Sequence, residues 1–362
     1  MSTYDWPEPQ GTVEEWRRLF HAAEAFKAAA PWDWMSEDQL FAVQNPETGE
    51  VGFCSITGEI GEHYALIAYL GEAGLGTYLT ALRGMKYASS FLEEHEHGMM
   101  LFETPQLQAS FEQRERITEL DWQIVQDIKV RIRGRKLWPL FRVFSPVRLP
   151  WHITGPQVRF LTTLLEQSLI VAQAQQRGEV SISPLIEIAT LPTTLPLILR
   201  ELEGGEWVFK QQVFSLQYPA IASANPLSVE DFADLRRKLP LKNDEMQVHL
   251  ALLAMPVEEG DLPPYLPYTL LVVDSHQGIV LDAKLLLAYP SLEDLWPQVL
   301  PALLALFEQW EGRPKRMLIA SERLYNLLAM PMGQLGIKLS RVQHLPELEE
   351  AYLDLENWTK RQ

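Results

Sequence analysis

Carboxylates in the C-terminal third of the chain are the residues whose spacing could support catalysis. Asp274, Asp282, Asp294 and Glu322 lie in or next to segments with strand or helix patterns. If three of them converged, they could hold divalent cations that cleave a phosphodiester or transfer a phosphoryl group. Asp274, Asp282 and Glu322 are therefore the candidates for a catalytic site.

The elements that would position these carboxylates lie within residues 246–362. Apolar runs bounded by turn residues predict strands, and apolar residues at helical spacing behind capping residues predict helices. The predicted strands are 248–257, 268–274, 279–289, 316–320 and 337–342, and the predicted helices are 292–311, 322–334 and 346–360. The order βββαβαβα is ribonuclease-H-like, and it predicts an α/β domain over 246–362.

One required carboxylate is missing from this pattern. Two-metal nucleases of this fold need an acid on the first strand, and residues 248–255 contain none. Asp274 also fits the start of a turn, and Glu322 fits the first turn of a helix, where the helix dipole favours a carboxylate. We therefore expect a binding or accessory protein with a catalytically degenerate domain and no catalysis. A metal-dependent nuclease or phosphoryl-transfer enzyme is the alternative.

The preceding part of the chain predicts an α+β domain. A helix that ends at Pro31 is followed by a hairpin of strands 40–44 and 51–57, a strand over 64–70 and a helix over 73–90. Further elements are expected as strands over 99–102 and 107–111 and a helix over 118–128. Pro146, Pro150 and Trp151 interrupt the chain, so we predict a first domain over 1–150 and a second module over 151–362. The sequence leaves the fold of residues 179–245 open.

Four cations spaced by two residues form the strongest local charge pattern. Lys129, Arg131, Arg133 and Arg135 would share one face of an extended segment and could contact a phosphate backbone. The alternative is a solvated strand whose cations pair with carboxylates of the same molecule. The formal net charge of −17 disfavours a nucleic-acid partner because it repels phosphates at long range.

Tryptophans near the two ends of the first domain could form a pocket. Trp32, Trp34 and Trp151 could bind a peptide or a small molecule, or could fill a core between a helix and a sheet. His95 and His97 could share a strand face and hold a metal, but no other ligand cluster accompanies them, so a solvated loop is expected. We predict no metal site and no cofactor, and an unidentified protein or small-molecule partner.

Composition sets the class of protein. Hydrophobic residues make up 47% of the 362 residues and charged residues 22%, which is typical of folded domains. No apolar run reaches the roughly 20 residues of a membrane span, and the first residues lack a secretory pattern. The single cysteine, Cys54, excludes an internal disulfide and agrees with a reducing compartment. We therefore expect a cytoplasmic protein that does not bind membranes, and its oligomeric state stays open.

Several motifs resemble those of a bacterial family of uncharacterised two-domain proteins. They include PWxWM at 31–35, VQNPETGE at 43–50 and RGxxxWPxFR at 133–142, followed by LVVD at 271–274 and RPKR at 313–316. The resemblance implies an N-terminal domain of unknown function followed by a second one. It implies no activity and no functional residues.

Overall fold

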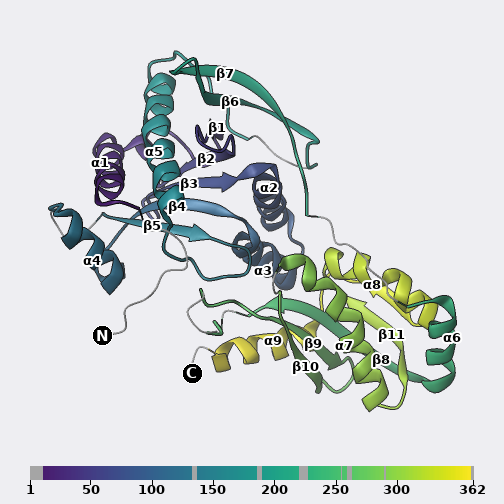
Figure 1. Cartoon of the computed structure of the whole chain (residues 1–362). Coiled ribbons are helices and arrows are strands. Elements are labelled where there is room, and N and C mark those ends of the chain that lie inside the picture. The colour runs from purple at the N-terminus through teal and green to yellow at the C-terminus, as the bar shows by residue number, and fades with distance from the viewer. Residues whose placement is uncertain are drawn as a thin grey trace. The chain divides into compact units, whose positions relative to one another are not determined.

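The protein is described by a computed structural model that covers residues 11–132, 137–185, 190–219, 227–253, 255–258, 263–288 and 291–359. The chain forms two compact units, and each contains one mixed sheet with helices (Figure 1). The first unit comprises Met1–Leu79, Thr104–Ser145 and Pro150–Tyr218. The second comprises Thr80–Glu103, Pro146–Leu149 and Pro219–Gln362.

The first unit is built on a seven-stranded sheet of order β5-β4-β3-β2-β1-β6-β7. Its strands are β1 (Phe41–Gln44), β2 (Val51–Thr57), β3 (Ala65–Leu70), β4 (Gln106–Glu112), β5 (Trp138–Phe144), β6 (Thr194–Glu203) and β7 (Glu206–Ser215). Neighbours pair antiparallel except β1 and β6, which pair parallel through Ala42 and Leu199. The predicted hairpin of the first two strands is confirmed.

Helices α1 (Val13–Ala29) and α5 (Gly155–Gln176) lie side by side against this sheet (Figure 1). Thr12 begins α1 with a capping box, in which the Glu15 side chain accepts from the Thr12 N–H. The apolar stripes of both helices are buried in one core, with Leu19, Phe26 and Leu161 all fully covered. Helices α2 (Gly71–Tyr87) and α4 (Glu119–Ile128) agree with the predicted segments.

Two segments differ from the sequence predictions in this part of the chain. Residues 99–102, predicted as a strand, are the end of helix α3 (Phe91–Met99) and a 3-10 helix, Met100–Glu103. Apolar residues in a short run fit either structure, and here the preceding helix continues into a tighter turn. Helix α5 and strands β6 and β7 follow residue 150 but lie in the unit of the first sheet, because β6 pairs with β1.

The second unit has a five-stranded sheet of order β10-β9-β8-β11-β12. Its strands are β8 (Leu241–Leu252), β9 (Tyr268–Asp274), β10 (Val280–Leu286), β11 (Arg313–Ile319) and β12 (Lys338–Arg341). Strand β9 pairs antiparallel with β8 and β10, and β11 pairs parallel with β8 and β12. The mixed α/β class is therefore confirmed, although β8 begins at Leu241 instead of residue 248.

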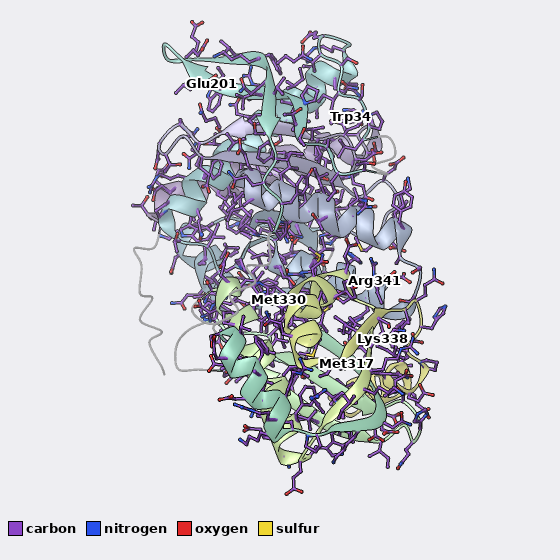
Figure 2. The ribbon with its side chains drawn as sticks, turned by 90° about the vertical axis from the view of Figure 1, so that its right-hand side faces the viewer. Trp34, Glu201, Met317, Met330, Lys338 and Arg341 are labelled. Carbon is purple, nitrogen blue, oxygen red and sulfur yellow. The ribbon has the colours of Figure 1, made fainter. Side chains whose placement is uncertain are left out.

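Helices cover both faces of this second sheet. They are α3, α6 (Val229–Lys238), α7 (Trp296–Gln309), α8 (Glu322–Leu335) and α9 (Pro346–Thr359). Alternation along β8 sends Val248 and Leu250 into the core with α7 and α8, together with Met317 of β11, which Figure 2 labels. Ala251 faces the opposite core, which includes Leu92 of α3 and Tyr352 of α9. Within the described residues, no helix is long and apolar enough to cross a membrane.

Candidate functional site

Buried charged side chains gather in the second unit where strands β8 and β11 end. Glu103, at the end of the 3-10 helix, has a side chain that is only 3% exposed. Arg323 in the first turn of α8 donates two parallel hydrogen bonds to its carboxylate, of 2.9 and 3.0 Å. The Tyr268 hydroxyl on β9 donates to the same carboxylate at 2.5 Å. A bidentate pair of this kind fixes both partners in orientation as well as in distance.

The surroundings of Arg323 favour its charged form. Burial disfavours the charged guanidinium, but the Glu103 carboxylate outweighs this effect, so the pKa of Arg323 lies above its ordinary value. The guanidinium also lies over the ring of Trp296, 4.7 Å from its centroid. Burial, reinforced by the nearby Glu103 charge, raises the pKa of Tyr268 well above its ordinary value. Tyr268 therefore stays protonated and acts as a donor.

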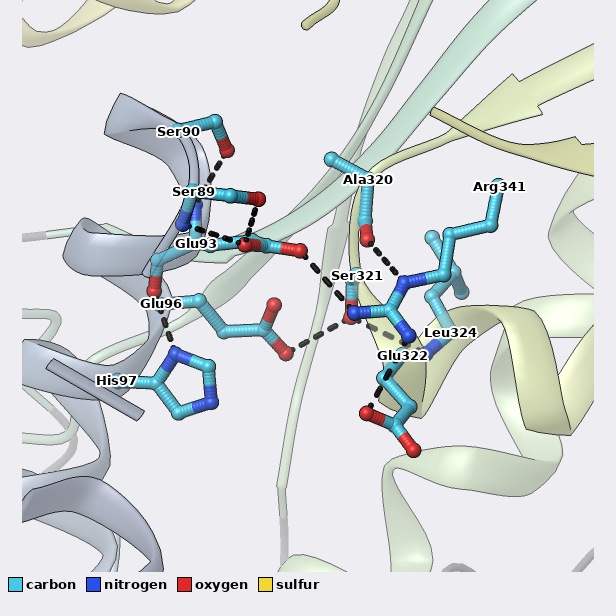
Figure 3. A network of polar contacts seen from close by, with 10 residues as sticks. All are labelled: Ser89, Ser90, Glu93, Glu96, His97, Ala320, Ser321, Glu322, Leu324 and Arg341. Atoms are coloured by element: carbon cyan, nitrogen blue, oxygen red, sulfur yellow. Dashed lines mark hydrogen bonds and ion pairs between the residues drawn. The ribbon is translucent and has the colours of Figure 1, made fainter. Parts of the chain in front are cut away.

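A second buried carboxylate, Glu96 of α3, contacts the start of α8. The Ser321 hydroxyl donates to Glu96 Oε1 at 2.8 Å and accepts from the Leu324 N–H at 3.1 Å as the helix cap (Figure 3). Burial raises the pKa of Glu96 although Arg323 and Ser321 oppose this shift. Glu96 accepts from a serine hydroxyl, whereas Glu103 has a bidentate arginine partner.

A third carboxylate, Glu93, joins the start of α3 to the end of β12. Its oxygens accept from the Ser89 N–H and hydroxyl at 2.9 and 2.7 Å and from Arg341 Nη2 at 3.1 Å. Burial opposes ionisation of Glu93, but the Ser89 and Arg341 hydrogen bonds prevail and lower its pKa. Figure 3 shows the Arg341 guanidinium between Glu93 and Glu322, with Nε donating to the Ala320 carbonyl.

Three histidines lie near this network. The solvated loop that was expected for His95 and His97 is wrong, because both lie in a helix. His95 and His97 belong to helix α3, where residues two apart point in different directions. The His95 Nε2 is 2.7 Å from the Tyr352 hydroxyl, and His97 Nδ1 is 2.6 Å from the Glu93 carbonyl oxygen. His249 on β8 is fully buried, and its ring nitrogens have no partner within the described residues. Burial, together with His95, lowers the pKa of His249 to about 3, so this ring is neutral.

A small cavity lies between these groups. Its volume is about 20 Å³, which leaves room for about one water molecule. Its lining includes Glu96, Glu103, Tyr268, Ser321 and Arg323. Such a volume is too small for an organic substrate. The hydrogen bonds around it connect residues 89–103 to the start of α8.

The predicted catalytic carboxylates do not come together. Within the described ranges, no three His, Cys, Asp or Glu side chains are grouped so that they could hold a metal ion. Asp274 Oδ1 accepts from the His276 and Gln277 N–H groups in a turn, at 2.9 and 2.7 Å. The Asp294 carboxylate accepts from the N–H and hydroxyl of Ser291, the N-cap residue of the 3-10 helix Leu292–Asp294. Glu322 is an exposed residue paired with Arg341.

Asp282 also lies apart from these acids. It is on β10, where its backbone pairs with Val272 of β9. Strand β10 is the outermost strand of its sheet, two strands away from β8, so Asp282 is far from the strand ends that carry Glu322. Asp274, Asp294 and Glu322 thus have structural partners, and Asp282 lies on a different strand, so the four acids form no common site.

The predicted tryptophan pocket is not formed. Trp32 is buried, with its ring 5.5 Å from Phe111 between centroids. Trp34, labelled in Figure 2, donates its indole N–H to the Ala172 carbonyl at 3.0 Å. Trp151 forms a backbone bridge with Val143 beside β5. These contacts correspond to the alternative prediction, in which the tryptophans fill and border a core.

The predicted basic strand is described only in part. Lys129 has a left-handed backbone, φ 56°, at the end of α4, so it terminates a helix instead of continuing a strand. Arg131 is exposed, and Arg133 and Arg135 lie outside the described residues. Lys129, the first of the four cations, therefore does not lie in the extended strand that was predicted.

The residues that do gather were missed by reasoning from the sequence. Glu103 and Arg323 are separated by 220 positions, and no local pattern connects them. The nearest signal is the position of Glu103 directly after the apolar residues Leu101 and Phe102, which indicates burial. A buried acid then requires a cation, but its identity follows only from the fold.

Comparisons with known proteins agree with the two-domain organisation. Residues 16–185 match a domain of unknown function (DUF7309). Residues 231–356 match a second domain of unknown function (DUF6930). No curated protein matches the chain. The chain therefore matches two domains of unknown function in succession, and the predicted resemblance to uncharacterised two-domain proteins is confirmed.

Proposed function

We propose that this chain is a non-catalytic binding or accessory protein whose second domain is ribonuclease-H-like and catalytically degenerate. This proposal rests on which side chains lie at the ends of strands β8 and β11. Nucleases of this fold would need metal-binding carboxylates there, whereas the Glu103–Arg323 pair and Tyr268 fill this position. A carboxylate held by an arginine is poorly suited to bind a cation, because its oxygens are already neutralised.

The strand arrangement supports the ribonuclease-H-like assignment. Three strands pair antiparallel in the order β10-β9-β8, and two parallel strands, β11 and β12, follow on the other side of β8. Helix α7 leads from β10 to β11, and helix α8 leads from β11 to β12, as crossover connections between parallel strands require. The burial of the single cysteine, Cys54, is in line with a reducing compartment, and we propose a cytoplasmic location.

The test is a nuclease and phosphatase assay of the full chain with Mg²⁺ or Mn²⁺. We expect no hydrolysis above a blank and no saturable Mn²⁺ binding by calorimetry. Asp274→Asn and Glu322→Gln serve as variants of the candidate acids, and Glu24→Gln, in α1, is a control for lost surface charge. Hydrolysis that disappears in the first two variants and persists in the control would overturn the proposal in favour of a metal-dependent enzyme.

A further inference from the structure

The outer edge of β7 is a feature that the proposed function does not use. β7 ends the seven-stranded sheet, and within the described residues it pairs only with β6. Gly204 and Gly205 join the two strands with φ of 59° and 91°, as a two-residue type I′ turn requires. Because Glu203 and Glu206 pair next to the turn, even-numbered residues of β7 bond to β6. Odd-numbered residues direct their N–H and C=O groups outward.

These outward backbone groups have few partners. The Trp207 carbonyl accepts from Arg200 at 3.3 Å, and the Val213 carbonyl accepts from the Gln212 side chain at 3.4 Å, both within the hairpin. In the part of the chain that the structure describes, no hydrogen bond reaches the outward groups of Phe209 or Gln211. The outward groups of Phe209 and Gln211, in the middle of this ten-residue strand, thus present a template for further pairing.

The opposite edge of the sheet shows how such an edge is usually protected. β5 contains Pro139 and forms a bridge with Trp151, and proline and covering segments both prevent strand addition. β7 contains no proline. Its one charged interior residue, Lys210, pairs with Glu201 and Glu203 of β6.

Exposed apolar side chains lie along the same edge. Phe209 is 39% exposed and Val213 is 58% exposed, and both lie on one face of β7 because they are four residues apart. Arg200 lies over the Phe209 ring, 4.2 Å from its centroid, and holds the ring in place. A strand added here would cover apolar side chains as well as satisfy backbone groups.

We propose that a second copy of this chain adds its own β7 antiparallel to this edge, about a two-fold axis at Gln211. In this register Phe209 faces Val213 of the second copy, and Lys210 faces Gln212. Aromatic and β-branched residues are favourable cross-strand pairs. All the facing odd-numbered residues direct their backbone groups toward each other, so each pair exchanges both hydrogen bonds.

Alternative registers are less favourable. A two-fold axis at Lys210 places the two lysines directly opposite each other, and like charges in that position are destabilising. A shift by one residue would place side chains from opposite faces of the sheet against each other. The axis at Gln211 avoids both problems.

The experiment is analytical ultracentrifugation of the full chain over a range of concentrations. We expect a reversible dimer, weakened by roughly tenfold or more in Phe209→Glu and in Val213→Lys. The double variant should return to within about threefold of the unchanged chain, since the introduced carboxylate then faces the introduced ammonium across the axis. Ile60→Lys, at a residue 81% exposed in the β2–β3 loop, is the control and should leave the dimer unchanged.

Gln211→Pro gives a second test that does not depend on side-chain packing. It removes an N–H that points away from β6, so the hairpin ladder remains while the pairing at the axis is lost. Circular dichroism verifies the fold of each variant. A chain that stays monomeric at all concentrations, or a dimer insensitive to Gln211→Pro and to both single variants, would overturn the proposal. So would an edge that pairs only with an extended segment of a different protein.

Discussion

Glu103 and Arg323 form a buried, bidentate pair in the second unit. Removing one partner leaves the other charged and buried, which costs about 3–5 kcal/mol. We expect Arg323→Ala to lower the free energy of unfolding by that amount in chemical denaturation near neutral pH. The double variant Arg323→Met with Glu103→Gln should recover most of the loss, because the amide oxygen still accepts from Tyr268. Equal losses in the single and double variants would contradict this account.

Glu96 should make the stability of the folded chain depend on pH. Burial raises its pKa in the folded chain above the ordinary value of 4.5, so the folded state binds more protons than the unfolded state between these two pKa values. The free energy of unfolding therefore falls as pH rises through this interval. We expect Glu96→Gln to match the unchanged chain below about pH 4 and to exceed it in stability near pH 7. Denaturant titrations at both pH values would measure the difference, and a destabilised variant at pH 7 would refute it.

At the scale of elements, two helical glycines should respond oppositely to alanine. A Cβ on Gly76 of α2 would collide with the backbone carbonyl of Gln217, which cannot rotate away. A Cβ on Gly333 of α8 would meet nothing within 4 Å. We expect Gly76→Ala to destabilise by about 1–3 kcal/mol and Gly333→Ala to stabilise by roughly 0.5–1 kcal/mol. Thermal melts of both variants would test this, and a neutral Gly76→Ala would show that α2 can shift.

Elements with local signals were predictable from the sequence, and contacts between distant segments were not. Thr118 begins helix α4 with the capping pattern that its spacing indicates. The hairpin at β1 and β2 follows from its turn residues. Residues 99–102 were mispredicted because a short apolar run has no distinctive period. The buried cluster was missed because Glu103 and Arg323 lie 220 positions apart and meet only through the fold of the second unit.

At the scale of the whole molecule, the units do not follow the order of the chain. Residues 80–103 precede β4 and β5 of the first sheet, yet they belong to the second unit. Leu92 from this segment is fully buried in a core with Leu271 and Tyr352. A domain boundary predicted from prolines and composition cannot show that residues 80–103 belong to the second unit.

The consequence is that residues 219–362 should not fold stably alone. Without residues 80–103, Arg323 loses its carboxylate partner and the core around Leu92 becomes exposed. We expect the isolated fragment to bind a hydrophobic dye and to melt without a sharp transition, as partly folded states do. Addition of a peptide of residues 80–103 should restore cooperative melting, whereas the same peptide with Leu92→Asp and Glu103→Ala should not. A fragment that melts as sharply as the full chain would mean that α3 is peripheral to this unit.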